Sequence, residues 1–381
     1  MDPLEDSRRY ASITDDALAS LRRLIGVPIT ETVEPWCYEV TRDNIRHYAH
    51  GIGDDNPLWC DPAYAAGGPH TALVAPPSFL FALNRVISGY VGGLPGIHAM
   101  WAGADLNWHG WFRRGDEISV TAHLKDLVTH QTRFAGRSVQ QIYHAEFRNQ
   151  DGTLIADGDS WCFRTERDTA RELGTKYDKA KATAPMRYDQ AELEKIWSLY
   201  RDEQVRGAEP RYIEDVAVGD VVSPMAKGPM TVTGYIGYAQ GWGGLYIRAN
   251  KLAWKQLEKH PGLGIANKFG IPDVPERVHW EDDLATDVGT PAAYDYGPER
   301  CSWLTHHITN WMGDAGFLAQ HRSQIRRHNP VGDWITINGQ VSAITADANG
   351  SPLVEITQEA RTQTGELSAT GVALVRLPSR A

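Results

Sequence analysis

The pattern of apolar and polar positions predicts helices first and strands later in the N-terminal part of the chain. Apolar residues recur at helical spacing over residues 11–26, and again after Thr41, a residue suited to cap a helix. A longer, central helix is predicted from residue 77 to about 90. Over residues 105–164 apolar and polar positions alternate between turn signals, which predicts an antiparallel meander.

A charged, alanine-rich stretch without apolar periodicity covers residues 165–190 and predicts a linker on the surface. A polar helix is expected next, over about 189–206. We therefore divide the chain into an N-terminal domain, residues 1–165, a linker and helix, residues 166–208, and a C-terminal domain, residues 209–381.

The second domain repeats signals of the first. The turn at Gly115-Asp116 recurs 217 positions later at Gly332-Asp333, and the turn at Gly152 recurs 213 positions later at Gly365. Two matched turn–strand signals at nearly one offset indicate a duplication. A helix followed by a meander, used twice, predicts two α+β units that pack side by side with their sheets forming one continuous surface.

Composition agrees with two domains and excludes several function classes. A chain of 381 residues is long for one core, and 42% hydrophobic with 23% charged residues is typical of soluble globular proteins. No apolar run approaches the ~18 residues of a membrane span. The N-terminus has no apolar signal region, so a cytoplasmic protein is expected. A net charge of −10 without a dense Lys/Arg run argues against nucleic acid or a membrane surface as partner.

Cysteine and histidine spacing gives no sign of a metal or a disulfide framework. Cys37, Cys60, Cys162 and Cys301 lie far apart without a CxxC pair, so reduced and mostly buried thiols are expected. No HExxH-like arrangement occurs, and neither a metal nor a cofactor is predicted.

One motif carries a family resemblance. The run Gly53-Asp-Asp-Asn-Pro-Leu-Trp59, with Ala65 after it, resembles the motif of MaoC-like (R)-specific enoyl-CoA hydratases and acyl dehydratases. The segments that begin at Tyr294 and His307 are similar to the C-terminal half of the same group. The resemblance covers most of residues 20–378 and implies a tandem hot-dog fold, in which each unit wraps an antiparallel sheet around a central helix.

The resemblance also implies a catalytic set: an Asp, a His five residues later, and a backbone N–H from a Gly at the start of the central helix. The first half keeps Asp54 and Asn56 but has Trp59 in place of the His. Indole cannot exchange a proton at neutral pH. Pro77 stands at the Gly position and has no N–H. The first half is therefore predicted to be a degenerate site that forms a wall for the acyl chain. For Asp54 two roles stay open, a catalytic one and the capping of the loop that follows it.

The second half shows the opposite losses. Aligning Ala65 with Ala285 places His279 opposite Trp59, and Gly297 opposite Pro77. The family Asp position holds Val274, with Asp273 one residue away. We predict His279 as the acid/base, the Gly297 N–H as the donor to the thioester oxygen, and Asp273 as the carboxylate partner. A structural His279 and a turn-forming Asp273 are the alternatives.

Substrate-binding residues are predicted from aromatic and polar side chains near the motifs. Thirteen tryptophans include four near both motif segments, which suggests an aromatic pocket for a bulky acyl group, with plain core packing as the alternative: Trp59, Trp280, Trp303 and Trp311. His307 and Asn310 share a helix face and are expected to line this pocket, with a buried hydrogen bond of the histidine as the alternative. Asn56 completes the predicted set.

The sequence thus predicts a lyase that adds water to, or removes it from, an α,β-unsaturated acyl-CoA, and that forms a homo-oligomer, a dimer. Trp59, Pro77 and Val274 keep a second hypothesis open, a non-catalytic hot-dog subunit that binds thioesters or completes a partner's site. An acyl-CoA thioesterase is a third, because hot-dog folds support that chemistry too.

Overall fold

The structure is a computed structural model that describes residues 12–29, 34–132, 136–166, 187–347 and 349–380. The first half contains the following elements: α1 (Asp15–Arg22), α2 (Arg42–Gly51), α3 (Pro57–Cys60), α4 (Pro62–Gly67), η2 (Pro77–Phe79), α5 (Leu80–Leu83), β1 (His98–Trp108), β2 (Ser119–Thr132), β3 (Gly136–Arg148) and β4 (Leu154–Thr165).

After α8 (Gln190–Arg201) and η3 (Ile213–Asp215), the second half begins with β5 (Val221–Lys227) and α9 (Val232–Trp242). An excursion precedes its central helix: α10 (Asn250–Lys259), η4 (Pro261–Leu263), β6 (Ile265–Ala266), β7 (Pro272–Asp273), η5 (Pro275–His279) and α11 (Asp282–Asp287). The central helix α12 (Gly297–Met312) leads into the second meander: β8 (Phe317–Ile325), β9 (Ile335–Ala346), β10 (Pro352–Thr362) and β11 (Leu367–Arg376).

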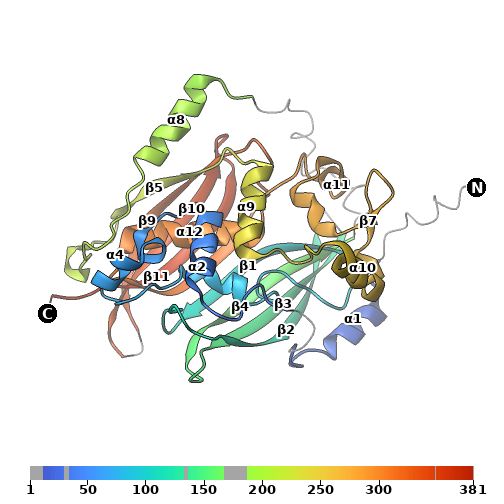
Figure 1. Cartoon of the computed structure of the whole chain (residues 1–381), viewed down its shortest axis with the longest axis horizontal. Helices are drawn as coiled ribbons and strands as arrows, with labels where there is room; N and C mark the ends of the chain where they lie inside the picture. The colour runs from blue at the N-terminus through green and yellow to red at the C-terminus, as the bar shows by residue number, and fades with distance from the viewer. Residues whose placement is uncertain (1–11, 30–33, 133–135, 167–186, 348, 381) are drawn as a thin grey trace, which may run out of the picture.

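Nine strands form one antiparallel sheet in the order β2-β3-β4-β1-β8-β11-β10-β9-β5. The two halves meet where β1 pairs with β8, with Asp105 opposite Arg322. Figure 1 shows the strands of the first half, in cyan and green, continuing into those of the second, in orange and red. The predicted continuous surface of two units is confirmed, and the fold is a double hot-dog.

The duplicated turns have the same backbone geometry. Gly115 and Gly332 have φ angles of 94° and 93°, and Gly152 and Gly365 have 75° and 82°. These are left-handed conformations that glycine adopts without steric cost. The repeat read from the sequence is therefore present in the three-dimensional structure.

Only the second half has a long central helix, and the helix predicted over residues 77–90 is wrong beyond residue 83. The first half has η2 and α5, which end where Asn84 becomes extended, with φ −153° and ψ 133°. The Asn84 side chain accepts hydrogen bonds from the N–H groups of Val86 and Ile87. The Ser88 hydroxyl donates back to Phe81 O or Asn84 O. Side chains that bond local backbone in this way compete with the helix.

Helices α2 and α9, one from each half, pack directly against each other (Figure 1). Their backbones approach closely at two glycines. A Cβ on Gly241 would lie 2.6 Å from His47 O, and one on Gly51 would lie 3.1 Å from Gly237 O. Larger residues at these positions would push the helices, and with them the two halves, apart.

The predicted helix cap is present, and one helix is shorter than expected. Thr41 caps α2 by accepting from Asn44 N, and Asp189 caps α8, which ends at Arg201 rather than Arg206. Most of the predicted linker, residues 167–186, lies outside the described residues. The four cysteines are free, and only Cys60 is not buried.

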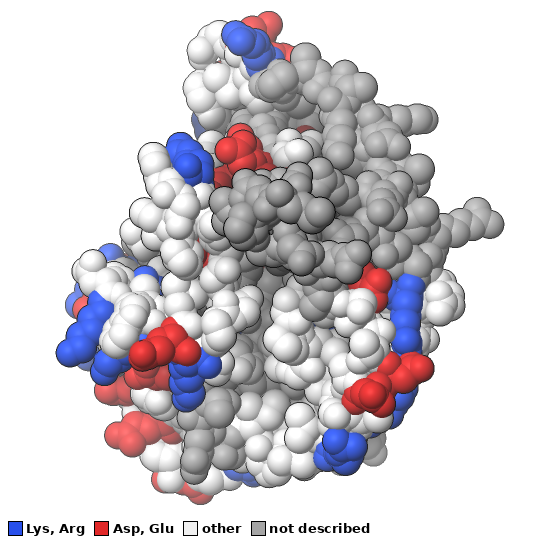
Figure 2. All heavy atoms as spheres, turned by 90° about the vertical axis from the view of Figure 1, so that its right-hand side faces the viewer, with Lys and Arg blue, Asp and Glu red and all other residues white. Residues whose placement is uncertain are grey.

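One face of the described surface is mixed in charge. On the face seen in Figure 2, Lys and Arg side chains occur in small groups beside acidic ones, separated by uncharged surface. No helix in the described part of the chain is long and apolar enough to span a bilayer.

Candidate functional site

The main cavity lies between the two halves. It has a volume of about 780 Å³ and is lined by residues 88–101 of the first half and by the start of α12, η5 and α10 of the second. His279, Tyr296 and Gly297 lie together in its wall. The broken helix of the first half makes room here, because the glycine-rich segment after α5 replaces further helical turns.

His279 is the last residue of η5, and its ring is fixed on two sides. Its Nδ1 lies 2.7 Å from Tyr294 O, and its ring stacks on that of Tyr296 with centroids 3.7 Å apart. A carbonyl oxygen only accepts, so Nδ1 carries the proton and Nε2 keeps its lone pair. Burial lowers the pKa of His279 to about 4, although the hydrogen bond that it donates to Tyr294 O opposes this shift. The imidazole is therefore a neutral proton acceptor at neutral pH.

Gly297 opens α12, and its N–H has no hydrogen-bond acceptor among the described residues. The first N–H groups of a helix are unpaired within the helix and point along the positive end of its dipole. A Cβ at this position would lie 2.6 Å from Trp101 Cε3, so no other residue fits without displacement. The cavity therefore has a free backbone donor next to the Tyr296 ring on which His279 stacks.

Glu276 is a buried carboxylate of this wall that sequence reasoning missed. It accepts hydrogen bonds from Leu245 N, Tyr246 N and the Tyr296 hydroxyl, at 2.7 to 3.2 Å. Burial raises its pKa, while these donors oppose the rise. Glu276 thus fixes Tyr296 and, through the ring stack, His279. Its place three residues before His279, within one short helix, was the sequence signal that could have identified it.

Asp295 and Arg300, which also line the cavity, form a buried ion pair at the start of α12. The Asp295 carboxylate accepts from both Arg300 Nε, at 2.8 Å, and Arg300 Nη2, at 2.5 Å, and also from Asn329. Both charged side chains are buried. A buried pair of this kind tolerates joint replacement better than the loss of one partner.

We expect Arg300→Met to lower the free energy of unfolding by about 3–5 kcal/mol, because it leaves the Asp295 carboxylate buried without its cation. Urea unfolding followed by circular dichroism measures this change. Arg322→Met, on an exposed position of β8, is the matched control and should change stability little. Equal stabilities for the two variants would contradict the structural role given to the pair.

Asp273 is not among the residues that line the cavity. It is the last residue of β7. Its carboxylate lies 3.5 Å from Arg277 Nε and accepts a hydrogen bond from Val274 N. Val274, at the family Asp position, is buried. The structure therefore brings His279 and Gly297 together but leaves Asp273 outside the set.

Asp54 is placed in a different buried cluster. Its Oδ1 accepts from Asn56 N and lies 3.4 Å from His306 Nε2 of α12. Lys227 Nζ lies 3.0 Å from His306 Nδ1 and donates to Gly53 O. Burial raises the pKa of Asp54 to about 6, opposed by the bond from Asn56 and by Lys227. The retained motif residue thus joins the two halves, away from the cavity.

The remaining predicted binding residues also lie outside the cavity lining. His307 bonds Ser223 O and the Gln358 side chain, which is the alternative of a buried hydrogen bond given for this histidine. The Asn310 amide nitrogen donates to Glu203, while its Oδ1 has no partner in the described part of the chain. Asn56 caps α3 through Leu58 N. None of the four tryptophans named from the sequence, Trp59, Trp280, Trp303 and Trp311, lines it; the tryptophans that do are Trp101 and Trp242.

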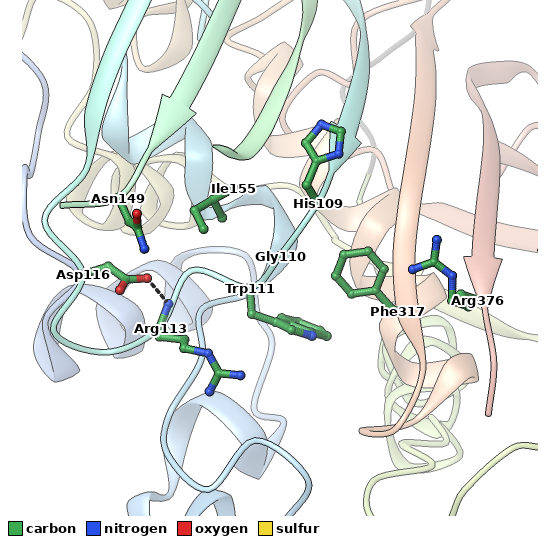
Figure 3. Close-up of a pocket in the computed structure, with 9 residues that line it drawn as sticks. All are labelled: His109, Gly110, Trp111, Arg113, Asp116, Asn149, Ile155, Phe317 and Arg376. Carbon is green, nitrogen blue, oxygen red and sulfur yellow. Dashed lines mark hydrogen bonds between the residues drawn. The ribbon is translucent and has the colours of Figure 1, made fainter. Parts of the chain in front are cut away.

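The counterpart of this cavity in the first half is largely filled. Trp108 Nε1 donates to Pro77 O, and Trp111 packs edge-on against Phe317 with centroids 5.8 Å apart. Between them only about 10 Å³ is left. A shallower cavity of about 340 Å³ remains outside, where Trp111 and Phe317 point toward each other from the two halves (Figure 3). The duplicated site is therefore closed by aromatic side chains.

Comparison with known proteins gives results for part of the chain and for the whole fold. Residues 24–158 match the family described as FAS1-like, dehydratase domain region. A UPF0336 protein of Parafrankia sp. is 33% identical over 141 residues, which are 35% of this chain and 87% of that protein.

Two solved structures are similar over nearly the whole chain. One, titled MaoC-like dehydratase, has a TM-score of 0.64 at 17% identity, covering 94% of this chain and all (100%) of that one. The other is a Mycobacterium tuberculosis protein described as having a double hot-dog fold, with a TM-score of 0.50 at 10% identity, covering 91% of this chain and 96% of that one. At these identities the likeness concerns the fold alone.

Proposed function

Because the chain belongs to the UPF0336 family and has the double hot-dog fold of MaoC-like dehydratases, we propose that it is a lyase that hydrates an α,β-unsaturated acyl thioester, or dehydrates the 3-hydroxyacyl product. The observation that carries the proposal is the pairing of His279 and Gly297 in the wall of one cavity. The acyl group is carried as a CoA ester in this proposal.

In the hydration direction, His279 Nε2 takes a proton from a water molecule, and the oxygen of that water forms a bond to the β-carbon. The electron pair of the carbon–carbon double bond moves toward the thioester, and the negative charge gathers on the thioester oxygen. The Gly297 N–H donates a hydrogen bond to this oxygen. The imidazolium then returns its proton to the α-carbon, so His279 serves as base and then as acid.

The other residues of the wall keep this geometry. The Tyr294 carbonyl accepts from Nδ1 and so leaves Nε2 as the base. Glu276 holds the Tyr296 hydroxyl, and the Tyr296 ring supports the imidazole. The apolar rings of Trp101 and Trp242 would face the acyl chain. The cavity volume of about 780 Å³ leaves room for a bulky acyl group.

We expect kcat/KM for the free enzyme to stay flat from neutral pH down to about pH 5. The reason is that the pKa of His279 is lowered to about 4, so its neutral, proton-accepting form persists below the ordinary histidine range and is lost only as the pH falls through that value. A pH–rate profile with an enoyl-CoA measures this. A falling limb centred near 6.5, the value of an ordinary histidine, would contradict the assignment.

One observation favours a second candidate, a thioester-binding subunit without turnover. Val274 replaces the family carboxylate, and Asp273 lies outside the cavity lining. Binding of a saturated acyl-CoA, together with no loss of enoyl absorbance at high enzyme concentration, would favour that candidate over the lyase.

A further inference from the structure

The lining of the main cavity includes a group of cationic side chains: Arg248, Lys255 and Lys259. Lys255 and Lys259 lie four residues apart on α10, so they share one face of that helix. Both are exposed, and Arg248 is half-buried. These side chains and α10 lie between α9 and η5, where the first half has only residues 52–56 between α2 and α3.

The surroundings do not neutralise this group. In the described part of the chain, Arg248, Lys255 and Lys259 form no ion pair with an acidic residue. Glu34 is the one exposed acidic residue among those lining the cavity. The two buried carboxylates of the lining, Glu276 and Asp295, already accept hydrogen bonds.

A further cation lies behind Arg248. The buried Arg85 side chain donates to Gly244 O and Trp242 O, in the segment that leads to Arg248. Burial lowers the pKa of Arg85 to about 10, and the charge of Arg248 adds to that effect. Arg85 and Arg248 therefore repel each other, an effect that the carboxylates of Glu276 and Glu34 oppose. An anion supplied from outside would relieve the repulsion further.

We infer that Arg248, Lys255 and Lys259 bind phosphate groups attached to a pantetheine thioester, either the diphosphate of CoA or the phosphodiester that links pantetheine to a carrier protein. This inference rests on the proposed function, since it places the thioester end of the same molecule at His279 and Gly297. With a net charge of −10 the chain as a whole repels such anions, so local cations at the cavity supply the attraction that the overall charge does not.

The test compares two double variants. Lys255→Glu with Lys259→Glu reverses two cations of the lining. The matched control, Lys251→Glu with Lys268→Glu, makes the same charge change at exposed lysines nearby that do not line the cavity. Each is assayed with the CoA thioester, the carrier-protein thioester and the N-acetylcysteamine thioester of one enoic acid, and the last of these has no phosphate.

For the lining variant we expect KM for the CoA ester to rise about tenfold or more, the effect of losing a hydrogen bond to a charged group. Its kcat, and both constants for the phosphate-free ester, should stay near wild type, and the control should change neither. If the rise appears with a carrier-protein thioester and not with CoA, the phosphate comes from a carrier protein. Equal KM changes for the esters with and without phosphate, or equal changes in both variants, would overturn the inference.

Calorimetric titration with CoA and with a carrier-protein thioester separates this inference from the proposed function. Weaker binding of either by the lining variant, in a protein that turns over no substrate, would support the phosphate site and reject the lyase. Turnover by wild type with binding unchanged in the lining variant would reject the phosphate site and leave the lyase standing. A wild-type protein that binds neither molecule would also reject the phosphate site.

Discussion

Replacing His279 by Ala is expected to lower kcat for hydration by about two to four orders of magnitude, the usual range for the loss of a general acid/base. The reason is that Nε2 is the free proton acceptor of the cavity wall, since Tyr294 O holds Nδ1. The variant should fold, which circular dichroism and a thermal midpoint close to wild type would show. Initial rates with an enoyl-CoA measure the effect.

Asp54→Asn is the informative comparison. This residue keeps the family motif but contacts His306 instead of the cavity. We expect a small effect on kcat, because any change passes through the packing of the two halves. If Asp54→Asn abolishes hydration while His279→Ala retains it, the first half contains the working site and the assignment of halves is reversed.

Replacing Gly297 by Ala should lower kcat by about two to three orders of magnitude, the range found when one oxyanion donor is lost. The added Cβ would lie 2.6 Å from Trp101 Cε3 and 3.1 Å from Trp101 O, so the start of α12 has to move and its N–H moves with it. Stopped assays at saturating enoyl-CoA measure this loss.

Two further variants separate the donor from general disturbance. Gly92 lines the same cavity, and a Cβ there meets nothing within 4 Å, so Gly92→Ala should keep the wild-type kcat. Adding Trp101→Ala to Gly297→Ala removes the ring that the new methyl group meets and should restore part of the rate. A Gly297→Ala variant with wild-type kcat would contradict the role of this N–H.

The sequence predicts two α+β units because turn chemistry is local, while the hot-dog form of these units was implied by the resemblance of the Gly53–Trp59 motif. Gly115 and Gly332 need the same left-handed backbone, and the alternation of the strands around them follows from burial on one face. The first central helix could not be predicted with the same success. Its apolar spacing continues past Leu83, but the side chains of Asn84 and Ser88 form hydrogen bonds with the backbone there and end the helix. These bonds compete with helical hydrogen bonds, and the apolar period of the sequence gives no sign of them.

The site was predictable in part. Motif spacing identified His279 and Gly297, which the fold places in one cavity wall. The same spacing gave Asp273, whose place in the short strand β7 directs it to Arg277 instead. Glu276, Trp101 and Trp242 were missed because their proximity to His279 depends on which loops fold over the cavity. Because that arrangement is set by tertiary contacts, no periodic pattern in the sequence indicates it.

The pairing of His279 with Gly297 as a working hydratase site is tested most directly by the ultraviolet absorbance of the conjugated thioester, followed with enoyl-CoAs of graded size. We expect wild-type protein to remove this absorbance in forming the 3-hydroxyacyl product. His279→Ala should do so at least about a hundredfold more slowly, and Asp54→Asn should stay close to wild type. Unchanged absorbance with every enoyl-CoA, or equal rates for wild type and His279→Ala, would contradict it.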